Sequence, residues 1–135
     1  MNFEQYQNYL IDTATSLLSI DSTSGFTAKV TDYLIDTVKE LGYPVYKNNI
    51  GNVIVTVEGE DDSEPVALSA HVDTLGLMVR SITSDGMLMI TSIGSPLLPS
   101  LDGEYCNIHT RDGRVYTGTI LSLSPAVHVL SLIHI

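Results

Sequence analysis

Residues 66–79, V-A-L-S-A-H-V-D-T-L-G-L-M-V, mark the point at which the character of the sequence changes. Residues 66–71 are mostly apolar and carry no acidic or basic side chain except His71, which is typical of a strand buried on both faces. Asp73 follows two positions later, so a strand would place both side chains on the same side. From Gly76 onward the pattern becomes one of closely spaced strands. The stretch therefore predicts a change from an α/β unit to an all-β unit.

Upstream of this stretch, the hydrophobic pattern first has helical and then strand periodicity. Apolar residues at three- and four-residue spacing predict helices over residues 2–18 and 27–41. Gly42 stands where a left-handed helix C-cap is expected, and Pro44 prevents continuation of the helix. Short strands are then predicted at residues 45–47 and 52–57. Helices followed by strands favour a three-layer α/β domain, of which residues 1–74 would form the front part.

Downstream, the pattern indicates strands without helices. The predicted strands are residues 76–83, 87–93, 106–110 and 115–121. Asp85-Gly86 and Asp112-Gly113 lie between pairs of these strands and are typical of hairpin turns. We therefore expect residues 75–135 to open an all-β unit, barrel-like or a small sandwich.

The composition excludes several classes of protein. Six Lys plus Arg against sixteen Asp plus Glu give a net charge of −10, which argues against binding to a nucleic-acid backbone. A single cysteine excludes an internal disulfide framework and agrees with a reducing compartment. The first residues have neither the basic nor the apolar region of a signal peptide. No apolar run approaches the roughly 20 residues that span a bilayer. We expect a soluble, cytoplasmic protein.

His71 and Asp73 are the residues with the clearest potential for chemistry. A neutral imidazole is a good ligand for zinc or cobalt. A carboxylate on the same face can fix the tautomer of the ring, or can itself bind the metal. An isolated H-x-D pattern occurs often by chance, and the simpler interpretation is a histidine that ends a strand. The surrounding sequence is therefore needed to choose between these interpretations.

Five short motifs supply that context. They are Ser24-Gly25-Phe26, Gly51-Asn52, Ala70-His71-x-Asp73-x-x-Gly76-x-Met78-Val79, Gly118-x-Ile120 and Pro125-Ala126-Val127-His128. In these motifs and their order the chain resembles the TET-type deblocking and glutamyl aminopeptidases, which are co-catalytic two-metal exopeptidases. The similarity covers about residues 3–130. Asn49 is a small departure, since relatives often carry Asp before the Gly-Asn pair.

The resemblance implies a function and a site. His71 would be a ligand of one of two divalent metal ions, zinc or cobalt, and Asp73 would be the catalytic-site residue that orients it. The reaction would be hydrolysis of N-terminal peptide bonds by a metal-activated water. The β unit would begin an inserted domain through which such enzymes form homo-oligomers. Peptides would be the substrates, with no nucleic-acid or membrane partner.

The resemblance also implies that part of the active site is missing from this sequence. In the family the remaining ligands and a Glu-Glu pair, which supplies the general base, follow the inserted domain. The chain contains no Glu-Glu pair. We therefore expect an N-terminal fragment that is inactive by itself, because one ligand cannot hold two metals. Residues 131–135 are similar to translated sequencing-adaptor read-through, and we expect them to be foreign to the family.

Two alternatives remain open. The first is a carboxypeptidase- or aminoacylase-like amidohydrolase, since such enzymes share the H-x-D motif. The second is a non-catalytic interaction fragment. Its incomplete β unit would leave unpaired edge strands, which are sites of strand addition between copies.

Overall fold

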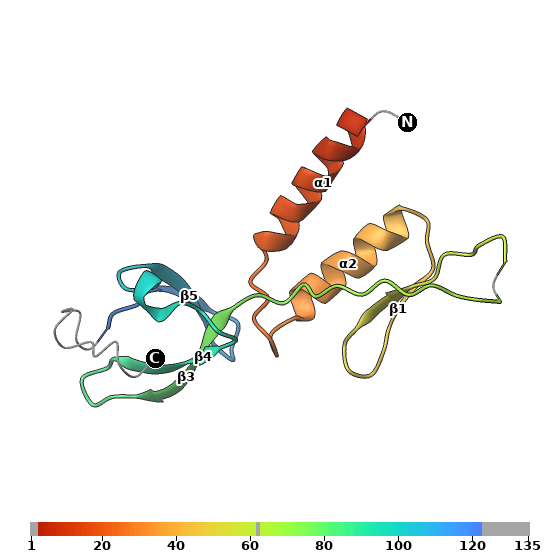
Figure 1. Ribbon diagram of the computed structural model, residues 1–135. Helices are drawn as coiled ribbons and strands as arrows, with labels where there is room; N and C mark the ends of the chain where they lie inside the picture. The colour runs from red at the N-terminus through yellow and green to blue at the C-terminus, as the bar shows by residue number, and fades with distance from the viewer. Residues whose placement is uncertain (1–2, 62, 123–135) are drawn as a thin grey trace. The chain divides into compact units, whose positions relative to one another are not determined.

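The computed structural model describes residues 3–61 and 63–122 (Figure 1). The chain divides into two compact units, Met1–Gly94 and Ser95–Ile135. The sequence predicts a boundary between a catalytic α/β domain and an inserted β domain after residue 74. This boundary between domains stays a prediction. Two predictions lie outside the described part of the chain: the last family motif, at residues 125–128, and the expectation that residues 131–135 are foreign to the family.

Two helices open the first unit, as the periodicity predicts. They are α1, Phe3–Leu18, and α2, Ala28–Glu40. Gly42 ends α2 with a φ of 82° and donates its backbone N–H to the carbonyl of Lys39 at 2.9 Å. The left-handed conformation is available to glycine without the clash that a Cβ causes. Val30 on α2 is fully buried, and it is the one buried hydrophobic residue among those described.

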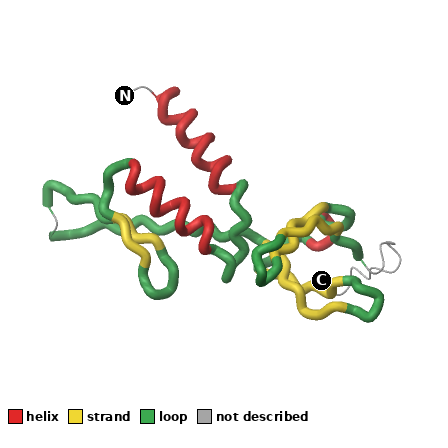
Figure 2. Tube along the Cα trace, turned by 180° about the vertical axis from the view of Figure 1, so that it is seen from behind, coloured by secondary structure: helices red, strands yellow, loops and turns green. Residues whose placement is uncertain are grey.

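The strands pair as three antiparallel hairpins in the described part of the chain (Figure 2). In the first unit, β1, Val45–Lys47, pairs with β2, Val53–Val55, and this hairpin lies against α2. The second hairpin joins β3, Gly76–Ile82, to β4, Leu88–Ile93, with an irregularity in register between Val79 and Ser81. The other unit contains β5, Tyr105–His109, and β6, Val115–Thr119. Each predicted strand of the β unit is therefore present, with its ends shifted slightly.

The two predicted hairpin turns are confirmed. Gly86 and Gly113 have φ values of 85° and 83°, which accounts for glycine at both positions. The stretch that the sequence predicts to be all-β also contains a short 3-10 turn, η1, Leu98–Ser100, which the prediction of strands without helices missed. Pro99 lies at its start, where its fixed φ favours such a turn.

The predicted strand over residues 66–71 is wrong for the described chain. These residues join no sheet among the described residues, and Val66 and Leu68 are 88% and 97% exposed. A strand buried on both faces requires neighbouring strands and covering helices. The apolar composition of residues 66–71 indicates a tendency to be buried, but it does not show which strands and helices would cover them.

The observed content of helices and small antiparallel sheets agrees with the predicted α/β class in its coarser form. No helix in the described ranges is both long enough and apolar enough to cross a membrane.

Candidate active site around His71

The candidate site lies where residues 22–24 run beside residues 72–74, within the first unit. Thr23 and Thr74 form a parallel β-bridge. The backbone N–H of Thr74 donates to the carbonyl of Ser22 at 3.0 Å. The hydroxyl of Ser22 donates to the carbonyl of Val72 at 3.1 Å, and Ser22 is fully buried. We call residues 22–24 the Ser22–Ser24 segment. This segment follows α1 in the chain and is hydrogen-bonded to residues 72–74, next to His71.

Gly76 permits this close approach. A Cβ at this position would lie 2.1 Å from Oγ1 and 2.9 Å from Cβ of Thr23. Ordinary van der Waals contacts begin near 3.4 Å. A side chain at residue 76 would therefore push Thr23 away, which explains why a glycine stands there.

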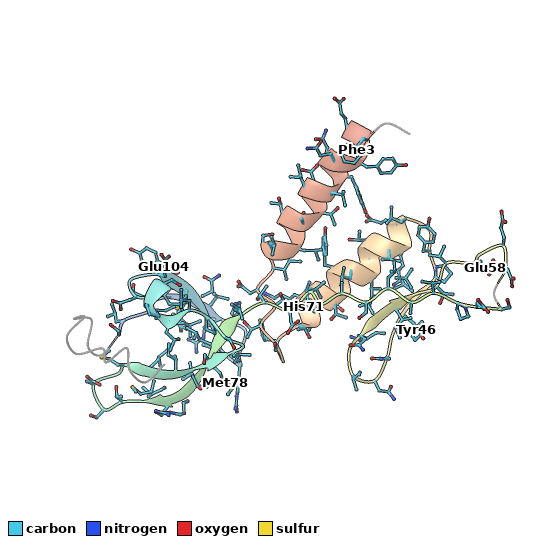
Figure 3. All side chains as sticks on the ribbon, in the orientation of Figure 1. Phe3, Tyr46, Glu58, His71, Met78 and Glu104 are labelled. Carbon is cyan, nitrogen blue, oxygen red and sulfur yellow. The ribbon has the colours of Figure 1, made fainter. Side chains whose placement is uncertain are left out.

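His71 lies on the extended segment that leads into β3 (Figure 3). Its Nδ1 lies 3.1 Å from Oδ1 of Asp73 and 3.2 Å from the backbone carbonyl oxygen of Asp73. Both oxygens accept hydrogen bonds, so Nδ1 must carry the proton that they share. In the neutral ring the lone pair is then on Nε2. The His71 side chain is 87% exposed, so this nitrogen is open to a ligand.

Asp73 has a second partner on its other carboxylate oxygen. The hydroxyl of Ser24 donates to Oδ2 of Asp73. This hydrogen bond is the main cause of a lowered Asp73 pKa, with a smaller contribution from His71 and an opposing one from desolvation. The carboxylate therefore stays ionised and remains an acceptor for the histidine proton.

The structure thus brings together the two residues that the H-x-D pattern singles out. Their predicted roles stay predictions. The contact between Ser24 and Asp73 is one that the sequence did not indicate, although Ser24 belongs to the Ser24-Gly25-Phe26 motif. The motif drew attention to residues 24–26, but it did not predict their partner. The contact joins residues 49 positions apart, so no local sequence pattern reveals it.

The His71 side chain is the one group at this position that is suited to bind a metal ion. The donor chemistry of His71 fits a single position on zinc or cobalt, with the ring orientation fixed by a carboxylate. The described residues contain no group of three or more His, Cys, Asp or Glu side chains placed to hold a metal.

Comparison with known proteins gives a consistent result. The family model described as M42 glutamyl aminopeptidase matches residues 51–132. The putative aminopeptidase YhfE of Bacillus subtilis is 45% identical over 113 residues, covering 84% of this chain and 33% of that protein. The glutamyl aminopeptidase of Lactococcus lactis is 35% identical over 108 residues, covering 78% of this chain and 30% of that protein.

A solved structure is similar as well. An aminopeptidase from the archaeon Desulfurococcus kamchatkensis matches 93% of this chain and 34% of its own, with a TM-score of 0.80 and 30% identity. This chain thus spans about a third of the length of these three relatives. The resemblance predicted from the motifs is confirmed, and the chain belongs to the M42 glutamyl aminopeptidase family.

Proposed function

We propose that the whole protein is a metal-dependent aminopeptidase that hydrolyses N-terminal peptide bonds. Membership of the M42 family supports the reaction class. The observation that carries the proposal for this chain is the geometry of His71, whose Nδ1 lies 3.1 Å from Asp73 while the side chain is 87% exposed.

In this proposal His71 and Asp73 act as a pair. Nε2 of His71 would hold one of two divalent ions, zinc or cobalt. Asp73 holds the proton on Nδ1, which keeps the ring in the tautomer that binds metal. When bound, the metal ions supply positive charge that lowers the pKa of a water molecule toward about 7 and polarises the substrate carbonyl.

We propose that the remaining ligands and the general base come from sequence that this chain does not contain. This proposal is supported by the sequence itself, since the chain has no Glu-Glu pair that could supply the expected general base. On this basis the 135-residue chain alone has no peptidase activity. One histidine cannot hold two metals, and without a base no proton is taken from the water.

We also propose that residues 75–135 open an inserted β domain through which the whole protein forms homo-oligomers. Among the described residues, the hairpins β3–β4 and β5–β6 each pair two strands, so their outer edges can accept further strands. Met78 on β3 and Tyr105 on β5 are exposed, as interface side chains are before assembly. The protein acts on peptides in the cytoplasm, with no membrane or nucleic-acid partner.

The test compares His71→Ala with His109→Ala, a matched histidine change on β5. Peptides with free and with acetylated N-termini serve as substrates, and bound metal is measured in each purified whole protein. We expect cleavage of free N-termini only, loss of activity with a chelator, and recovery with zinc or cobalt. His71→Ala should lose metal affinity and activity by more than the roughly 10- to 100-fold that loss of an orienting partner costs.

Three results would count against the proposal. His71→Ala with full activity and full metal content would remove His71 from the site. Activity that survives complete metal removal would remove the metal. Release of C-terminal residues or cleavage of N-acyl amino acids would favour the carboxypeptidase- or aminoacylase-like alternative.

A further inference from the structure

We propose that Ser24 is a positioning residue for His71, acting through the carboxylate of Asp73. The inference rests on the proposed function, because it concerns how the ligand histidine is held. It adds a residue from a distant part of the chain to the pair that the H-x-D pattern indicates.

The two oxygens of Asp73 have different partners. Oδ1 faces Nδ1 of His71 at 3.1 Å, and Oδ2 accepts the hydroxyl hydrogen of Ser24. The terminal torsion of an aspartate has a broad energy minimum, so a carboxylate with one partner can rotate. A second partner on the opposite oxygen fixes the plane of the carboxylate and thereby the direction from which His71 is held.

This restraint matters because the pair is open to solvent. The side chains of His71 and Asp73 are 87% and 38% exposed, so water competes for their hydrogen-bonding groups. Burial does not hold the imidazole in one orientation. The hydrogen-bonded chain from Ser24 to Asp73 to His71 supplies the restraint that packing would supply in a buried site.

Ser24 is itself placed by backbone contacts that do not involve His71. The preceding residues are tied to the opposite segment by the Thr23–Thr74 bridge and by the hydrogen bond from Thr74 to Ser22. The backbone N–H of Phe26 donates to the carbonyl of Thr23 at 2.7 Å and closes the turn that leads to α2. The hydroxyl of Ser24 therefore projects from a fixed turn.

A purely structural role for Ser24 makes a different prediction. In that case its hydroxyl would tie residues 22–24 to residues 72–74, and its loss would lower stability alone. The backbone bonds and the buried hydroxyl of Ser22 already provide that tie. We therefore expect loss of the Ser24 hydroxyl to alter metal binding more than stability.

The test uses Ser24→Ala, Ser24→Thr and the control Ser16→Ala in the whole protein. Ser16 is a half-buried serine on α1 whose hydroxyl donates to the carbonyl of Asp12. Affinity for Co²⁺ is measured by absorption titration, together with kcat and KM for a peptide with a free N-terminus. Thermal unfolding of the metal-free proteins measures stability separately.

We expect Ser24→Ala to weaken Co²⁺ binding by up to about 10-fold and to change the Co²⁺ absorption spectrum, because it acts one step further out than a direct orienting partner. The value of kcat should fall while KM stays nearly constant. Ser24→Thr keeps a hydroxyl on the same carbon and should restore affinity, since residue 24 is exposed and has room for a methyl group. Ser16→Ala should match the unmodified protein.

Unchanged Co²⁺ affinity and spectrum in Ser24→Ala would overturn the inference, whether or not stability falls. Equal impairment in Ser24→Ala and Ser24→Thr would also overturn it, because the hydroxyl would not be the relevant group. These outcomes differ from failure of the proposed function. If His71→Ala keeps its metal and activity, the ligand assignment itself is wrong, whereas an inactive His71→Ala with a normal Ser24→Ala refutes only the role of Ser24.

Discussion

Replacing Gly76 by alanine is expected to separate the Ser22–Ser24 segment from the segment that carries His71. The new Cβ would lie 2.1 Å from Oγ1 and 2.6 Å from Cγ2 of Thr23. Rotation of the Thr23 side chain can move these two atoms. It cannot move Cβ of Thr23, which would lie 2.9 Å from the new methyl group. The backbone of one segment must therefore shift.

The size of the effect follows from the contacts that this shift strains. Inserting a methyl group into a closely packed position costs about 1–3 kcal/mol. The bonds at risk are from Thr74 N–H to Ser22, at 3.0 Å, and from the Ser22 hydroxyl to Val72, at 3.1 Å. Each is worth roughly 1 kcal/mol. We expect the local opening free energy to fall by about 1–3 kcal/mol, which accelerates amide exchange about 5- to 150-fold.

Hydrogen-exchange mass spectrometry on the whole protein measures this change. Peptides that cover residues 19–27 and 70–78 should exchange faster in Gly76→Ala, while peptides from β5 and β6 should be unaffected. Exchange within about twofold of the unmodified protein in both peptides would refute the reasoning. It would mean that the chain absorbs the methyl group without opening the bridge.

Three further predictions concern other positions. Gly118→Ala should change the free energy of unfolding by less than about 1 kcal/mol in urea denaturation, because its Cβ would meet the flexible end of Ile108 at 2.7 Å. Arg114→Gln should raise the pKa of Asp112, measured by NMR titration, because Arg114 donates the hydrogen bond that lowers it most. The stability gained from the lowered pKa is present above the ordinary value of about 3.9 and is lost as the pH falls through the folded-state pKa. Gly42→Ala should cost about 1–2 kcal/mol in the same denaturation assay, because φ is 82° there, and a cost near zero would contradict this explanation.

The elements that the sequence predicts well are those with local causes. The helices follow from apolar spacing along one segment, and Gly42 marks the end of α2 within two residues. In each of the hairpins β3–β4 and β5–β6, the turn between the two strands contains a glycine with positive φ. Each of these features depends on residues a few positions apart, so the pattern contains the information needed.

The segment at residues 66–71 shows where such inference ends. Its apolar side chains predict burial, yet Leu68 is 97% exposed in the described chain. Burial depends on which other segments are present to cover it. The composition of a segment shows that it would be stable when buried on both faces. Whether it is buried depends on neighbouring strands and covering helices, which come from other segments.

The candidate site divides in the same way. The two-residue spacing of His71 and Asp73 predicts their contact, because extended backbone, even outside a sheet, places alternate side chains on the same side. The contact between Asp73 and Ser24 depends on a parallel bridge between segments 49 residues apart, and no local period records it.

The bridge and the hydroxyl make separable contributions to the site. Gly76→Ala displaces the whole Ser22–Ser24 segment, so it should disturb both the backbone pairing and the support of Asp73. Ser24→Ala removes only the support, because the Thr23–Thr74 bridge does not involve that hydroxyl. If positioning of His71 depends on the hydroxyl, both variants should weaken Co²⁺ binding, but only Gly76→Ala should accelerate exchange. If it depends on the backbone bridge, Ser24→Ala should bind Co²⁺ normally and Gly76→Ala alone should fail.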